Sequence, residues 1–185
     1  MTKSEKEMAQ NQLVENGLGS YLDALAAVRE FQKEIIKRSR RALEEKLNDL
    51  SKAMGIPVDR GEIANYITPV SNKEELGEWG GVVVTFSKEP VYCYFGLRFE
   101  RENSKCVTNV DVSMWTYKAS QRDFLLKYCK DVSPDFDNDY GNSIGLFMPI
   151  SKKEINNFEE KLEDLIDKWV EVWKKVGGIK NLSKK

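Results

Sequence analysis

Three aspartates alternate in a short acidic stretch, Asp135, Asp137 and Asp139, as the first ligands of a calcium-binding loop do. An EF-hand loop also needs glycine at its sixth position and glutamate at its twelfth. Tyr140 and Leu146 occupy these positions, so the stretch is not an EF-hand. We expect a solvated acidic turn here, and a divalent-metal-dependent enzyme that uses this loop is an alternative.

Histidine is absent from the sequence, which excludes Ser–His–Asp and Cys–His catalysis and histidine-rich zinc sites. The three cysteines, Cys93, Cys106 and Cys129, show no CxxC spacing, so they do not indicate a zinc site. Cys129 falls near the end of a predicted helix, where the helix dipole raises the pKa of a thiol. The sequence therefore predicts no enzyme, no cofactor and no metal ligands.

Aromatic residues alternate along two predicted neighbouring strands. Tyr92 and Tyr94 lie on one strand, Trp115 and Tyr117 on the next, and Arg98 shares their face. Tyrosine and tryptophan offer a large contact area with a polar group and are enriched at protein interfaces. We predict a binding surface formed by these five residues. The alternative is that one of the chain's own long helices covers this face of the sheet.

The densest basic run is Lys37, Arg38, Arg40 and Arg41, and its side chains would suit phosphate contacts. Glutamates stand four positions away on the same predicted helix, as in Glu34–Arg38, and such pairs stabilise a solvated helix face. The formal net charge of −1 also lacks the basic excess of most nucleic-acid-binding proteins. We expect a self-paired surface, with nucleic-acid binding through residues 37–41 as the alternative.

Hydrophobic periodicity and turn residues predict one α+β domain over residues 20–178, between a flexible leader (1–19) and a flexible tail (179–185). The fold class is a short antiparallel sheet of three to four strands, packed by long N-terminal and C-terminal amphipathic helices. Its expected elements are a helix over 20–54, short helical pieces near 61–66 and 72–76, an antiparallel meander over 80–117, a helix over 120–130, a strand over 143–149 and a helix over 151–177.

Capping residues mark the ends of the long helices. Ser20 followed by Asp23 predicts the start of the first helix, and Gly55 with Pro57 predicts its end. The run Ser151-Lys152-Lys153-Glu154 is a capping box for the last helix. The first helix carries an apolar stripe long enough for self-association, formed by Ile36, Leu43, Leu47, Leu50 and Met54.

The strands of the meander, at about 81–87, 91–100 and 106–116, have a register that burial of their apolar side chains determines. Leu97 then faces Val110, Phe95 faces both Val112 and Val82, and Tyr92 faces Trp115. Arg98 and Asp111 become diagonal neighbours, close enough to pair.

The order of helix, three antiparallel strands, helix, strand and long helix is similar to the layout of type III secretion chaperones and related small bacterial regulatory domains. Residues 50–58, where the first helix ends in Met54-Gly55-Ile56-Pro57, stand at a comparable helix end. The resemblance covers element order, and the long N-terminal helix and the stretch 56–79 depart from it. No residue role is carried over from it.

These features together predict a non-enzymatic protein-binding or regulatory module, such as an adaptor, chaperone or inhibitor. We expect a protein partner and a homodimer, formed through the first helix or the sheet edge. An odd, sparse set of cysteines fits a reducing, cytoplasmic compartment. We expect neither a signal peptide nor a membrane partner, because no apolar stretch approaches the ~20 residues of a membrane span.

Overall fold

The computed structural model describes residues 3–58, 60–67, 79–86, 91–102, 105–116, 118–133 and 143–182. The chain divides into two compact units, residues 1–34 and residues 35–185. Helix α1 (Lys3–Met54) contributes to both. It begins at Lys3, although Ser20 and Asp23 predicted a start at residue 20 after a flexible leader. Gly17 and Gly19 argue against a helix, since each costs about 1 kcal/mol relative to alanine, and yet both lie within α1.

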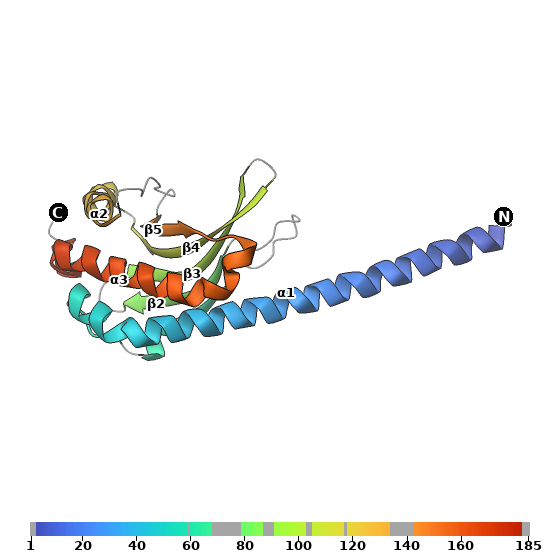
Figure 1. Cartoon of the computed structure of the whole chain (residues 1–185), viewed down its shortest axis with the longest axis horizontal. Coiled ribbons are helices and arrows are strands. Elements are labelled where there is room, and N and C mark those ends of the chain that lie inside the picture. Colours follow the sequence, from blue (N-terminus) through green and yellow to red (C-terminus); the bar gives the residue numbers. More distant parts are fainter. Residues whose placement is uncertain are drawn as a thin grey trace. The chain divides into compact units, whose positions relative to one another are not determined.

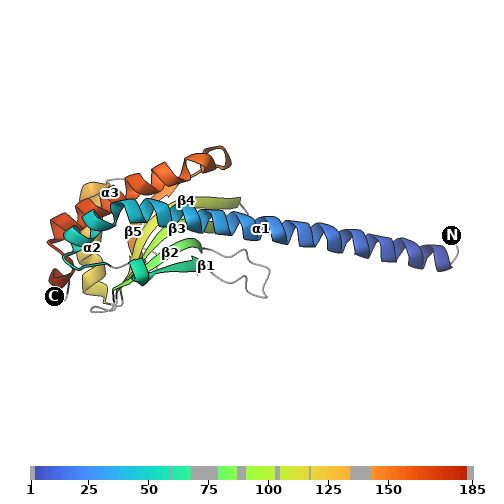
Figure 2. The ribbon, with the colours of Figure 1, turned by 90° about the horizontal axis from the view of Figure 1, so that it is seen from below.

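The larger unit is built on a five-stranded antiparallel sheet whose strands are neighbours in chain order (Figures 1 and 2). The sequence predicted three to four strands, and β1 is the additional one. A single 3-10 turn (Arg60–Glu62) precedes it, where a helical piece was expected near 61–66. The predicted piece at 72–76 lies outside the described residues. The strands are β1 (Ile63–Ile67), β2 (Trp79–Phe86), β3 (Val91–Glu102), β4 (Lys105–Trp115) and β5 (Ser143–Pro149).

The register of the sheet confirms the prediction from the apolar pattern. Phe95 on β3 lies opposite Val112 on β4 and Val82 on β2, and Leu97 lies opposite Val110. These side chains share one face, because successive residues of a strand point to opposite sides. That face is completely buried at all of these positions. A slip by one residue would turn these apolar side chains away from the helices to the opposite face of the sheet, which is why the pattern determines the register.

The same unit contains the helix α2 (Ala119–Val132), the 3-10 segment η2 (Lys152–Asn157) and the helix α3 (Phe158–Val176). Gly177 ends α3 in the left-handed region at φ 78°, where glycine is favoured. The short helix η3 (Ile179–Asn181) follows. Ile179 and Leu182 are buried, so this part of the expected flexible tail packs onto the domain. None of the described helices is long and apolar enough to cross a membrane.

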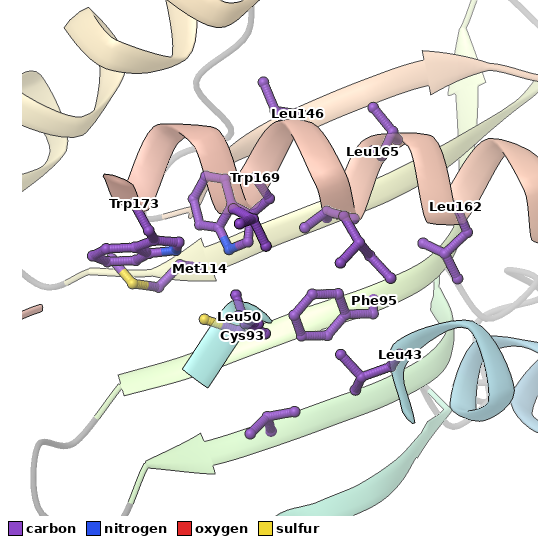
Figure 3. Close-up of a cluster of buried hydrophobic side chains, with 14 of the residues drawn as sticks. Leu43, Leu50, Cys93, Phe95, Met114, Leu146, Leu162, Leu165, Trp169 and Trp173 are labelled. Atoms are coloured by element: carbon purple, nitrogen blue, oxygen red, sulfur yellow. The ribbon is translucent and has the colours of Figure 1, made fainter. Parts of the chain in front are cut away.

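The core lies between one face of the sheet and two helices. The C-terminal part of α1 and helix α3 lie side by side on this face (Figures 1 and 2). Leu43 and Leu50 of α1 meet Phe95 of the sheet and Leu162 and Trp169 of α3 in one cluster (Figure 3). The stripe from Ile36 to Met54, predicted to mediate self-association, is buried in this core. It is therefore used within the chain, and this assignment of the dimer surface was wrong.

Candidate functional site

The outer face of the sheet, opposite α1 and α3, gathers the aromatic residues that the sequence singled out. Tyr66 of β1, which the sequence analysis missed, contacts Tyr94 edge-on, with ring centroids 5.8 Å apart. Its ring also lies 5.9 Å from that of Trp115 on β4. Tyr66 aligns across the strands with Gly81 and Gly96, which have no side chains. The two glycines leave the space in which rings from distant strands meet.

Tyr94 is fully buried and its hydroxyl is held by two backbone groups. The hydroxyl donates a hydrogen bond of 2.6 Å to the carbonyl of Leu97 and accepts one of 3.0 Å from the amide of Gly80. A Cβ atom at Gly96 would lie 2.6 Å from this hydroxyl, so the tyrosine needs glycine there. Burial raises the pKa of Tyr94 well above its usual range. The hydroxyl therefore bridges β2 and β3 and does not ionise.

Arg98 and Asp111 form a buried ion pair on the same face, as the predicted register implied. Nη1 of Arg98 lies 3.6 Å from Oδ2 of Asp111, and their side chains are 3% and 0% exposed. The guanidinium also lies 4.1 Å above the ring of Phe147 on β5, a cation–π contact. The Asp111 carboxylate and the Phe147 ring thus offset the cost of burying the Arg98 charge inside the fold.

Burial removes part of the predicted binding surface from contact with a partner. Tyr94 and Arg98 are inaccessible, Trp115 is half-buried, and Tyr92 is 37% exposed opposite Trp115. Tyr117 lies outside the described residues. The alternative that a long helix covers this face is not realised, because the C-terminal part of α1 and helix α3 pack on the opposite face of the sheet. Among the described residues of this predicted surface, Tyr92 and part of Trp115 remain accessible.

The two described thiols are poor nucleophiles. Cys93 is buried in the core beside Trp169, and burial raises its pKa well above the usual range. Burial also raises the pKa of the Cys129 thiol to about 12. The direction agrees with the sequence analysis, but the cause is loss of hydration rather than the helix dipole.

The basic run of α1 connects different elements of the fold. Nη2 of Arg38 donates to the carbonyl of Asn156 over 2.6 Å, and Arg40 donates to the carbonyl of Ile63 over 3.1 Å. Arg41 forms a two-pronged contact with Glu159 at the start of α3. This contact lowers the pKa of Glu159. These contacts reach other elements of the fold, whereas the sequence predicted pairs within the helix.

The acidic stretch 135–139 lies outside the described residues. Within the part of the chain that the structure covers, no group of three or more histidine, cysteine, aspartate or glutamate side chains could hold a metal ion.

A second candidate site lies on α1, in the smaller unit. Apart from Tyr92, every exposed large hydrophobic side chain among the described residues lies between residues 8 and 31 of α1. We call residues 8–31 the exposed segment. The sequence did not predict this segment, because Gly17 and Gly19 suggested a leader without helix. The members are Met8, Leu13, Val14, Leu18, Tyr21, Leu22 and Phe31.

Comparison of the chain with protein-family models, with curated proteins and with solved structures found no match. The similarity to type III secretion chaperones thus rests on element order alone.

Proposed function

We propose that this chain is a non-enzymatic protein-binding or regulatory module, of the adaptor, chaperone or inhibitor kind, and that it binds through the exposed segment. The observation that carries the proposal is the concentration of exposed apolar side chains there. Leu13 is 75% exposed, Val14 68% and Tyr21 63%. A concentration of exposed apolar side chains favours an interaction site, because removing apolar surface from water is favourable by about 25 cal/mol per Å².

The polar groups with chemistry suited to catalysis are engaged in contacts within the fold. The Tyr94 hydroxyl bridges two strands, Arg98 pairs with Asp111, and burial disfavours the thiolates of Cys93 and Cys129. These contacts support a structural role for the conspicuous polar residues. Two unbridged, buried thiols also fit a reducing compartment such as the cytoplasm.

Affinity capture from the source cells tests the proposal. The tagged full chain is compared with the variant Leu18→Glu/Leu25→Glu, which places two charges on the exposed segment. We expect at least one polypeptide, a different protein or an untagged copy of this chain, to be retained by the full chain and lost with the variant.

The matched control is Asn16→Ala/Asp23→Ala, which changes the opposite side of the same helix and should retain the polypeptide. If every captured polypeptide binds the full chain and Leu18→Glu/Leu25→Glu equally, the exposed segment is not a protein-binding surface and the proposal fails.

A further inference from the structure

The apolar side chains of the exposed segment follow a heptad pattern. Val14, Leu18, Tyr21, Leu25 and Val28 alternate in spacings of four and three residues. This average of 3.5 residues is the repeat of a coiled coil, and it assigns Leu18 and Leu25 to position a and the other three to position d. Val14, Leu18 and Tyr21 are more than half exposed. The five residues therefore form the apolar seam of a coiled coil, and within a single chain the seam stays exposed to solvent at Val14, Leu18 and Tyr21.

The helix itself gains from a partner in this stretch. Gly17 and Gly19 each disfavour a helix by about 1 kcal/mol relative to alanine. Apart from the adjoining residues and the nearby backbone of the helix itself, no atom lies within 4 Å of where a Cβ would stand at either glycine. Since most of the stability of a helix in a protein comes from packing of its apolar face, packing of the apolar seam would supply the missing stability.

The charged residues beside the seam distinguish a parallel from an antiparallel pairing of two such helices. Glu15 and Arg29 occupy e positions, seven residues on either side of Leu22, which is also an e position. The g positions are Gly17, Ala24 and Phe31, which carry no charge. In a parallel pair e faces g of the other helix, and neither charge would meet its opposite.

In an antiparallel pair e faces e. With the two-fold axis near Leu22, Glu15 of each copy then lies beside Arg29 of the other, and this pairing occurs twice. The same register places Leu18 against Val28 and Tyr21 against Leu25. The segment is therefore complementary to itself in this orientation, both in its apolar layers and in its charges.

We propose that residues 14–31 pair with the same residues of a second copy of this chain, as an antiparallel two-stranded coiled coil. This inference rests on the proposed function, because it names the protein that the exposed segment binds. A membrane surface fits less well, since the polar side of the helix carries Asp23 and Glu30 where membrane-binding helices carry lysine and arginine.

Sedimentation equilibrium of the purified full chain tests the pairing. We expect a monomer–dimer equilibrium that Leu18→Glu/Leu25→Glu shifts to monomer and that Asn16→Ala/Asp23→Ala leaves unchanged. Circular dichroism verifies that each variant keeps its folded domain. A chain that is monomeric at all concentrations, or a dimer that persists in Leu18→Glu/Leu25→Glu, overturns the proposal.

Charge reversal tests the orientation. Glu15→Arg alone and Arg29→Glu alone should each weaken the dimer about tenfold, since each turns two attractions into two repulsions of the order of an exposed ion pair. The double variant Glu15→Arg/Arg29→Glu should restore the dimer. If neither single reversal changes the dissociation constant of the dimer, the antiparallel register is overturned.

Affinity capture and sedimentation equilibrium together separate the inference from the function on which it rests. A monomeric chain that still captures another protein through the exposed segment contradicts self-pairing and leaves protein binding standing. A monomeric chain that captures nothing through this segment contradicts both.

Discussion

At the scale of single residues, the outer face of the sheet combines polar and aromatic side chains that satisfy one another. The absence of a side chain at Gly96 makes room for Tyr94, whose hydroxyl bridges β2 and β3. Beside it, the Arg98 guanidinium is placed between the Asp111 carboxylate and the Phe147 ring. A face that resembles a binding surface in sequence is thus largely internal structure.

The buried ion pair makes a prediction about stability. Arg98→Met should lower the free energy of unfolding by about 3–5 kcal/mol, because it leaves the Asp111 carboxylate buried without its counter-charge. Arg98→Met/Asp111→Leu should recover most of this loss, since it removes both charges. Urea unfolding followed by far-ultraviolet circular dichroism measures both values. Additive losses in the double variant would show that the two side chains do not act as a pair.

At the scale of elements, charged side chains position α3 against the C-terminal part of α1. The two helices run in the same direction, with Arg41 beside Glu159 and Lys46 beside Asp167. The Lys46–Asp167 contact measures 2.6 Å and raises the pKa of Lys46. Ahead of α3, the Glu154 carboxylate accepts hydrogen bonds from the amide and the hydroxyl of Ser151. The predicted capping box is confirmed, and it begins η2, which leads into α3.

The capping box predicts a pH dependence. The hydrogen bonds from Ser151, with the nearby Lys161, lower the pKa of Glu154 from 4.5 to about 2. A carboxylate with a lowered pKa in the folded state stabilises the fold above the unfolded pKa, and this contribution is lost as the pH falls from about 4.5 to 2. Glu154→Gln should therefore be less stable than the parent at pH 7 and equal to it near pH 2.

Thermal unfolding across this pH range measures the difference. Glu171→Gln, an exposed change on α3, is the control and should match the parent at pH 7. A stability gap between parent and Glu154→Gln that stays constant down to pH 2 would contradict the assignment.

The elements differ in how far the sequence determines them. The pairing of β3 with β4 was predictable, since strict alternation such as Cys93, Phe95 and Leu97 permits one buried register. Strand β1 was not, because its five residues are too few to establish an alternation, and a helical piece had been predicted near 61–66. The start of α1 was not predictable, because Gly17 and Gly19 disfavour a helix without preventing one.

The candidate sites were harder to predict, for a tertiary reason. The contact between Tyr66 and Trp115 joins strands that are three places apart in the sheet. No local pattern reveals such a contact, so the burial of Tyr94 could not be inferred from alternation. The heptad at Val14–Val28 was readable in principle, but it gained meaning only once the helix was known to extend through it.

At the scale of the whole molecule, the two units should differ in their contribution to stability. Removal of residues 1–30 deletes mostly exposed side chains and retains Ile35 and Ile36 of the core. The shortened chain should unfold within about 4 °C of the full-length variant Leu18→Glu/Leu25→Glu, a difference of about 1 kcal/mol or less. Thermal unfolding followed by circular dichroism measures this. A shortened chain that is unfolded at room temperature would show that the larger unit depends on residues 1–30.

The edge-on contact of Trp169 and Trp173, with ring centroids 5.6 Å apart in the core, has an optical consequence. All four tryptophans of the chain lie beyond residue 34, and the N-terminal unit contains none. Unfolding of the larger unit transfers these indoles to water and shifts their fluorescence to longer wavelengths, whereas melting of the N-terminal helix leaves the emission unchanged. The protein thus carries an intrinsic fluorophore that reports on one unit alone, and a partner that occupies the exposed segment should be invisible to it.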